Sequence, residues 1–363
     1  MIPMFKPYMS EKVMPALAEV LALSWIGQGP AVDSVEKKFE RMFNTFGALT
    51  LNSCTSALHL ALVLADVKDG DEVISTPLTC SATNIPILYQ RAKPVFADIQ
   101  KTALNIDPKS IKEKLSKKTK AIVIVHWGGE PCDMDEILEI ARERKIPVIE
   151  DAAHALGAMY RGKYIGTISD FTCFSFQAIK QITSVDGGIL VCKDPRAYKR
   201  GKLLRWYGID RASKGDIYWK FKVEEAGFKY HMNDVTATIL SIQLDDLHKV
   251  NSRRKEIADR YRKSLNNIPG LTLLETKKDR ESGYWLFTVL VERREDFIKM
   301  MKDNGIETHM VHIRCDVYPI FGGKRLKLPV MNEIEPKYVS IPLHAALTDD
   351  DVEKIITTIK KGW

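Results

Sequence analysis

Residues 121–125 read Ala121-Ile122-Val123-Ile124-Val125, an unbroken apolar run. Such a run is typical of a strand that is buried on both faces, as in a parallel sheet. Further short strands are predicted before and after it, with helices between several of them, at 48–51, 71–75, 94–98, 147–150, 171–176 and 188–192. Strands that alternate with helices predict a doubly wound, mainly parallel sheet of the α/β class.

The pattern changes after residue 234. A long helix is predicted from Val235 through Leu247, and it could extend past Arg253. A strand at 285–291, a helix at 294–304 and a last helix opened by Thr348 follow. A chain of 363 residues suits one large domain and one smaller domain. We therefore predict a large domain over residues 1–240 and a smaller α+β domain over residues 241–363.

Composition excludes several classes of protein. The net charge is +7, but basic and acidic residues are mixed along the chain, and the one dense basic run, 112–120, fits an exposed helix end. Nucleic acid is therefore not an expected partner. No apolar run reaches the roughly 18 residues of a membrane span, and the N-terminus has no signal-peptide pattern. The six cysteines form no C-x-x-C pair or metal-type cluster, which predicts free thiols, no metal and a cytoplasmic protein.

One candidate site lies in Asn52-Ser53-Cys54-Thr55-Ser56-Ala57-Leu58, between a predicted strand and a predicted helix. The first amides of a helix are unpaired donors at the positive end of the helix dipole, so they can hold a phosphate. The hydroxyls of Thr55 and Ser56 could add donors. Taken alone, however, such a segment is more often a simple helix N-cap.

Two further segments carry chemically useful side chains. Asp151, in Glu150-Asp151-Ala152-Ala153-His154, follows a buried strand at the edge where ligands of α/β sheets bind. Its carboxylate could hold a proton on a ring nitrogen, although Asp is also a common N-cap and His154 alone would more often be structural. Lys180 lies between two predicted strands, shortly before Gly187-Gly188. Its amine could form a Schiff base, although most lysines are simply solvated.

In combination these segments resemble a known family. A phosphate cradle, then an acid, then a lysine is the chain order of fold-type I pyridoxal-phosphate enzymes. The sequence resembles the sugar aminotransferases of the DegT, DnrJ, EryC and StrS family over nearly its whole length. The blocks that carry this resemblance include 25–30, 52–59, 70–74, 93–98, 150–158, 175–188 and 340–344. The resemblance implies a large domain with a mainly parallel, seven-stranded-type sheet and a smaller C-terminal domain.

The resemblance also implies catalytic roles. Lys180 would form the internal aldimine with pyridoxal 5'-phosphate, and as a free amine it would then move a proton between the substrate and the cofactor. Asp151 would pair with the pyridinium nitrogen, and His154 would lie close to the ring. Thr55, Ser56 and Ser175 match the family's phosphate-side positions.

The segment 227–234 resembles a family loop that reaches the neighbouring subunit's cofactor phosphate. Lys229 stands where the family usually has Asn, and His231 stands where it usually has Arg. A lysine can still donate to a phosphate. The implication is a homodimer with shared active sites.

Other positions depart from the family pattern or face its substrate. Cys80 stands where an aromatic ring usually stacks on the cofactor. The resemblance places Trp25, Tyr230, His312 and Arg314 on the substrate side. Arg314 would suit a diphosphate or a carboxylate because its fork is bidentate, but a surface salt bridge is an equal alternative.

The function implied is transfer of an amino group from glutamate to a nucleotide-linked keto-deoxy sugar, with C4 preferred over C3. Sugar dehydratases of the same fold carry His where this chain has Lys180, so the lysine argues against dehydration. A non-catalytic regulatory relative is the other alternative, and the presence of Asp151, His154 and Lys180 argues against it.

Overall fold

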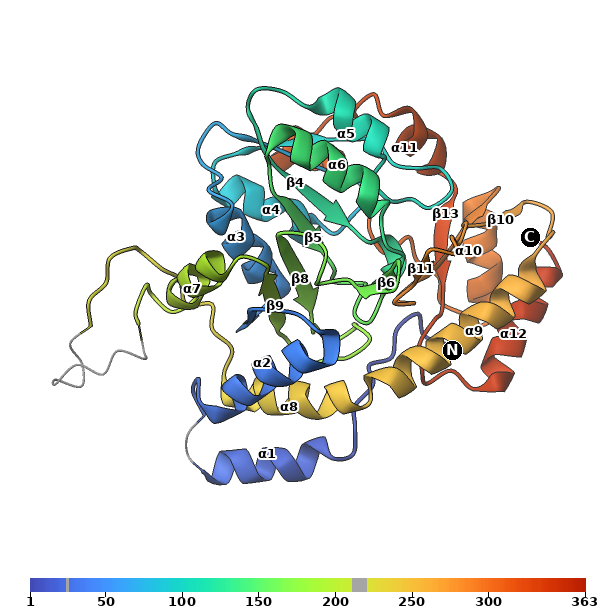
Figure 1. Ribbon diagram of the computed structural model, residues 1–363. Coiled ribbons are helices and arrows are strands. Elements are labelled where there is room, and N and C mark those ends of the chain that lie inside the picture. The colour runs from blue at the N-terminus through green and yellow to red at the C-terminus, as the bar shows by residue number, and fades with distance from the viewer. Residues whose placement is uncertain (24–25, 211–220) are drawn as a thin grey trace.

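The computed structural model describes residues 1–23, 26–210 and 221–363. A seven-stranded sheet forms the centre of the larger part of the molecule (Figure 1). In spatial order its strands are β1 (Ala48–Leu51), β9 (Gly188–Cys192), β8 (Phe171–Ser175), β5 (Val148–Asp151), β4 (Thr119–Val125), β2 (Glu72–Ser75) and β3 (Lys93–Phe96). The neighbours from β8 to β3 are parallel, whereas β9 runs antiparallel to both β1 and β8. The predicted α/β class and mainly parallel sheet are confirmed.

Helices cover both faces of this sheet, which explains the unbroken apolar run in β4. Ile122 and Ile124 point into a core beneath α2, α6 and α8, and Ala121 and Val123 point into the core beneath α3. All four side chains are buried, as the sequence predicts. The helices of these two layers are α2 (Pro30–Phe43), α3 (Cys54–Leu64), α4 (Ser81–Tyr89), α5 (Pro108–Lys114), α6 (Met134–Arg144), α7 (Pro195–Leu204) and α8 (Asp234–Asp245).

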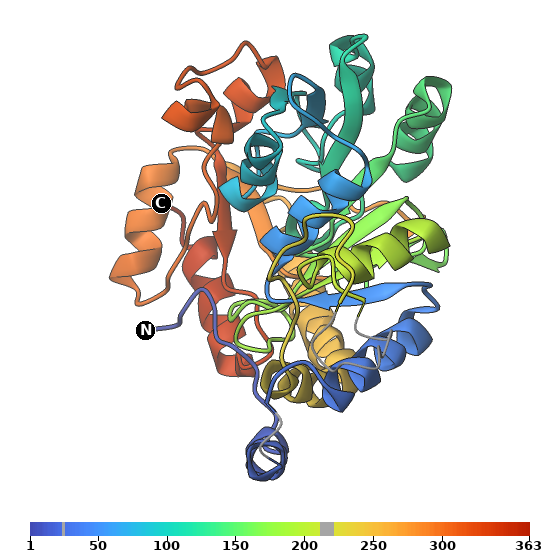
Figure 2. The ribbon, with the colours of Figure 1, turned by 90° about the vertical axis from the view of Figure 1, so that its left-hand side faces the viewer.

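The C-terminal part of the chain forms a second, antiparallel sheet. Its strands are β10 (Leu271–Leu273), β12 (Phe287–Val291) and β13 (Tyr338–Ile341), in that order. Figure 2 shows the helices of this part gathered beside the large sheet. They are α9 (Leu247–Leu265), α10 (Arg294–Asp303), α11 (Pro329–Ile334) and α12 (Asp349–Lys360). The last helix is opened by Thr348, as predicted, and Thr348 forms a capping box with Asp351 there.

Two predicted element bounds differ from the structure. The long helix after residue 234 is divided in two, because α8 ends at Asp245 and α9 begins at Leu247. The predicted strand at 285–291 begins only at Phe287, so Trp285 and Leu286 precede β12. A helix that the sequence patterns did not identify, α1 (Val13–Ala22), lies outside α8 (Figure 1). The division into domains at residue 240 stays a prediction.

Two backbone pairings link the C-terminal part of the chain to segments that precede it in the sequence. The N-terminal residues lie beside the C-terminal part of the chain, where Ile2 forms an isolated bridge with Ile306, shortly after α10. The segment before β12 passes through β11 (Arg280–Glu281), which pairs with β6 (Met159–Tyr160), and β6 pairs with β7 (Lys163–Tyr164). Among the described residues, no helix has the length and apolarity that crossing a membrane would require.

Candidate active site

Asp151 is the last residue of β5, at the carboxyl edge of the large sheet. It is 5% exposed and accepts two hydrogen bonds, from the Thr83 hydroxyl at 2.6 Å and from the Ala153 amide at 3.1 Å. Burial raises the pKa of Asp151, and these two donors oppose the rise. Both of these donors are neutral, so the charge of an ionised Asp151 would be left for a cationic partner.

Lys180 lies in the loop between β8 and β9 and is 9% exposed. Burial lowers the pKa of its amine to about 8, while the nearby Asp151 carboxylate raises it. The Nζ atom lies 3.6 Å from the centroid of the Trp285 ring. A lysine with this pKa is partly neutral near pH 7 to 8, so it can act as a nucleophile or as a base.

Aromatic rings surround the lysine and the acid. His154 stacks on Trp285 with ring centroids 3.8 Å apart, and His312 lies parallel to His154 at 5.7 Å. His154 is fully buried, and burial lowers the pKa values of both histidines, that of His312 to about 3. Both rings are therefore neutral. Among the described residues, His154 Nδ1 and His312 Nε2 have no hydrogen-bond partner although they are buried.

The candidate phosphate cradle lies at the start of α3. Ser53 is the N-cap, and its side chain accepts from the Ser56 amide. Ser56 donates to Asn52 Oδ1 at 2.7 Å, and Thr55 is half-buried in the first turn. A Cβ atom added to Gly188 would lie 2.4 Å from the Ser53 carbonyl oxygen, so only glycine lets β9 approach this turn. Ser53 as the N-cap satisfies the Ser56 amide, so the donors that this turn offers to a ligand are the amides that precede Ser56.

Two thiols lie near Lys180, and Ser175 ends the strand that leads into its loop. Cys80 is the half-buried N-cap residue of α4, and it lies near enough to Lys180 and Cys54 to influence their pKa values. Ser175 ends β8 and is buried; its oxygen accepts from the Gln177 amide at 3.4 Å. All six cysteines are free thiols, as predicted.

The predicted partner-reaching loop lies beside the cradle of its own chain. The Asn52 amide donates to the Tyr230 carbonyl at 2.7 Å, and the Asn52 side chain donates to the Lys229 carbonyl at 3.3 Å. The Lys229 side chain is exposed. The Tyr230 hydroxyl pairs with His59 Nδ1 at 2.9 Å. The structure therefore connects this loop to α3, and Lys229 is free to extend from it.

Arg314 is neither on the protein surface nor directed at the lysine. It is fully buried, and its guanidinium group makes two bonds of 2.6 Å to Asp316. It also bonds Asn332 and Glu335 at the end of α11. The salt bridge named as the alternative is present, with Asp316 and Glu335, but it is buried and not on the surface as expected. Trp25 lies outside the described residues.

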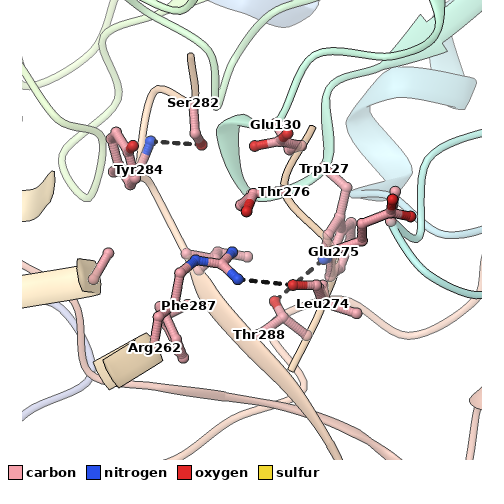
Figure 3. Close-up of a pocket in the computed structure, with 14 residues that line it drawn as sticks. Trp127, Glu130, Arg262, Leu274, Glu275, Thr276, Ser282, Tyr284, Phe287 and Thr288 are labelled. Atoms are coloured by element: carbon pink, nitrogen blue, oxygen red, sulfur yellow. Dashed lines mark hydrogen bonds between the residues drawn. The ribbon is translucent and has the colours of Figure 1, made fainter. Parts of the chain in front are cut away.

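Figure 3 shows a small cavity whose lining residues do not include Lys180. It has a volume of about 40 Å³, which is room for only a few water molecules. Glu130, Arg262 and Tyr284 are among the residues that line it. Trp127 lines it as well and packs edge-on against His154, so this indole lies between the cavity and the histidine cluster. A sugar or a cofactor does not fit there.

Sequence reasoning missed Thr83 and Trp285. Thr83 follows Cys80 by one helical turn, which could have suggested that the two share a face. Trp285 was assigned only to a strand, and no local pattern relates it to Lys180. Together with Lys180, Asp151 and the start of α3, they form a site with an amine, a buried carboxylate and a candidate phosphate cradle. These groups fit pyridoxal phosphate, whose aldehyde, ring nitrogen and phosphate need those three partners.

Comparison with known proteins supports this chemistry. The sequence model of the DegT/DnrJ/EryC1/StrS aminotransferase family matches residues 7–360. The GDP-perosamine synthase of Escherichia coli O157:H7 is 33% identical, over 100% of this chain and 98% of that protein.

Solved structures give the same picture. The sugar aminotransferase CalS13 from Micromonospora echinospora is 34% identical and superposes with a TM-score of 0.95, covering 100% of both chains. The putative sugar aminotransferase Spr1654 from Streptococcus pneumoniae, in its PLP form, is 28% identical with a TM-score of 0.92. That match covers 99% of this chain and 98% of the other.

Proposed function

The chain belongs to the DegT/DnrJ/EryC1/StrS aminotransferase family and is a pyridoxal-phosphate-dependent sugar aminotransferase; we propose that it uses Lys180 to move an amino group from glutamate to a nucleotide-linked keto-deoxy sugar. We favour C4 over C3 as the position that receives the amino group. The observation that carries the proposal is the buried Lys180 amine, whose pKa of about 8 reflects burial opposed by Asp151.

Lys180 has two tasks in this scheme. It would hold pyridoxal phosphate between turnovers, and as a free amine it would move a proton at the reacting carbon. Pyridoxal phosphate, when bound, supplies a ring that stabilises negative charge at that carbon. Because the pKa of Lys180 is close to neutral pH, the amine can both accept and return the proton.

Asp151 keeps the ring nitrogen protonated through a charge-assisted hydrogen bond. The Thr83 hydroxyl and the Ala153 amide hold the carboxylate in place and favour its ionised form. His154 is neutral because it is buried, so it borders the site without adding a positive charge that would compete for Asp151.

The α3 turn holds the phosphate group. The helix-start amides before Ser56 and the Thr55 hydroxyl would supply donors, and Ser56, whose hydroxyl now donates to Asn52, and Ser175 at the end of β8 stay candidate phosphate-side groups. The exposed Lys229 extends from a loop that is bonded to this turn. We propose that Lys229 reaches the cofactor phosphate of a second copy, so that a homodimer shares its active sites.

The substrate class rests on likeness to relatives. The name of the E. coli relative contains a nucleotide-linked sugar, which favours a nucleotide diphosphate sugar here. Tyr230 and His312 stay candidates for sugar contacts, because they border the cradle and the histidine cluster respectively. Glutamate is proposed as the donor from the resemblance to the family.

The test is a panel of keto nucleotide sugars incubated with the purified protein, pyridoxal phosphate and glutamate, with products identified by mass spectrometry. We expect one sugar to gain an amino group in exchange for its keto oxygen. Lys180→Ala should abolish both this product and the yellow colour of the bound cofactor, whereas replacement of the exposed Lys278 should change neither. Turnover by Lys180→Ala, or loss of water in place of amino transfer, would overturn the proposal.

A further inference from the structure

The Lys180 amine contacts a side chain that the proposed chemistry does not use. Its Nζ atom lies 3.6 Å from the centroid of the Trp285 ring, at the distance of a close cation–π contact. Trp285 is fully buried and belongs to the segment that leads into β12 of the small sheet. We propose that Trp285 is a positioning residue for Lys180, and that its indole face holds the free amine in the site. This inference rests on the proposed role of Lys180.

Few other groups near the Lys180 amine could stabilise its positive charge. The groups that act electrostatically on Lys180 are the Asp151 carboxylate and the thiols of Cys54 and Cys80, and Lys180 in turn acts on His154 and His312. Both histidines are neutral, and burial raises the pKa of the Cys54 thiol, so that thiol stays uncharged. Asp151 therefore supplies the one carboxylate charge, and in the loaded protein that charge is paired with the ring nitrogen. The indole face is then the stabilising partner that stays available to an ammonium group.

The indole is held rigidly, as a positioning role requires. Its Nε1 donates to the carbonyl of Ile179, the residue before the lysine, at 2.9 Å. Its own amide donates to the Gly128 carbonyl at 2.8 Å. Its ring stacks on His154 at 3.8 Å and on Phe5 at 5.5 Å. The ring thus ties the lysine loop of the large sheet to the segment that enters the small sheet.

Glycines let this segment approach so closely. A Cβ atom added to Gly283 would lie 2.9 Å from the His154 carbonyl oxygen, and one added to Gly129 would lie 2.8 Å from the same atom. Gly129 also has a φ angle of +104°, which disfavours other residues. The backbone around Trp285 is therefore packed against the His154 loop without space for adjustment.

The consequence concerns the amine while it is detached from the cofactor. A lysine side chain has four rotatable bonds and would otherwise sample many positions. An indole face at 3.6 Å restricts the amine to the site and favours its protonated form, whereas burial favours the neutral form. The two effects together keep the amine able to both give and take a proton.

The alternative is that Trp285 only fills space, and the two cases differ in a measurable way. We would remove the cofactor from the full-length protein and label its lysines with a trace of acetic anhydride across a range of pH. The Lys180 peptide, quantified by mass spectrometry, gives the pH midpoint of labelling, expected near 8 for the unchanged protein. The variants are Trp285→Leu, which keeps an apolar side chain, and Trp285→Phe, which keeps an aromatic face.

We expect Trp285→Leu to lower the midpoint by roughly one pH unit, because a desolvated cation–π contact is lost. Trp285→Phe should recover at least half of that change. The matched control is Trp127→Leu, which removes a buried indole that also packs on His154, and it should leave the midpoint unchanged. A thermal melt of each variant checks the fold. If Trp285→Leu does not fold, Trp285→Phe alone tests the inference: a lowered midpoint supports it, and an unchanged midpoint overturns it.

An unchanged or raised midpoint in Trp285→Leu would overturn the inference, as would a Trp285→Phe variant that behaves like Trp285→Leu. These results leave the proposed function intact if Lys180→Ala still abolishes colour and amino transfer. Conversely, covalent attachment of the cofactor in Lys180→Ala would show that the proposed function itself is wrong.

Discussion

Thr83→Val tests whether the ionised form of Asp151 is what the cofactor needs. The Thr83 hydroxyl donates to Asp151 Oδ2 at 2.6 Å and pairs with the Thr79 hydroxyl at 2.7 Å. Thr83 is 1% exposed, so water cannot readily replace the lost donor. Valine keeps the branched shape of the side chain, and Asp151 would retain only the Ala153 amide as a donor.

The expected size follows from this single hydrogen bond. A hydrogen bond to a charged group contributes about 1.5–3 kcal/mol, and about 1.4 kcal/mol corresponds to one pH unit. The hydroxyl lowers the pKa of Asp151, whereas burial raises it, so the variant carboxyl group ionises at a higher pH. If binding requires the carboxylate, the pH below which pyridoxal phosphate binding fails should rise by roughly one to two pH units.

The assay is the dissociation constant of pyridoxal phosphate between pH 5 and 8, measured by equilibrium dialysis. Thr79→Val is the matched control, since it removes a buried hydroxyl of the same cluster but leaves the contact between Thr83 and Asp151. It should move the acid limb of the profile by well under one pH unit. Coincident profiles for Thr83→Val and the unchanged protein, with equal thermal stability, would refute the reasoning.

Further predictions concern the shared site, the buried ion pair and acid stability. The Lys180→Ala and Lys229→Ala variants should each be weakly active or inactive alone. Mixed and allowed to exchange subunits, they should regain activity, because one site of the mixed dimer then has both lysines. Sedimentation as an active monomer would contradict the shared site. Arg314→Met should lower the free energy of unfolding by roughly 3–5 kcal/mol, since Asp316 stays buried without its partner. Unchanged stability with loss of sugar binding would instead give the guanidinium group a substrate role. Burial lowers the pKa of His59 from 6.5 to about 4, so the native state loses stability as the pH falls through this range. His59→Gln should make that decline shallower in urea titrations, and equal slopes would rule out His59 as a contributor.

Local patterns were enough to predict the central sheet and the places of two candidate site residues, Asp151 and Lys180. A strand buried on both faces must be apolar throughout, and 121–125 shows this directly. Asp151 is placed by the end of its own strand, and Lys180 by a loop between two strands. Short-range sequence order fixes such positions because the carboxyl ends of parallel strands share one edge of the sheet.

For the candidate phosphate cradle, the sequence predicted a polar helix start but not which residue caps the helix. The sequence showed small polar residues at a helix start, and the structure identifies Ser53 as the cap. Which of several hydroxyls caps a helix depends on one backbone turn, and that turn is set by the close approach of Gly188 from a distant strand.

Contacts between distant segments were decided by tertiary structure alone. Trp285 is 106 residues from the Ile179 carbonyl that it bonds, and no periodic pattern relates such positions. Arg314 could be read as a ligand-binding fork until packing placed it between Asp316 and Glu335. The direction of a long side chain depends on the charges and surfaces that folding brings to it. The sequence by itself therefore determined the chemistry available to this protein, and the packing of its C-terminal part against the large sheet decided which of those groups meet Lys180.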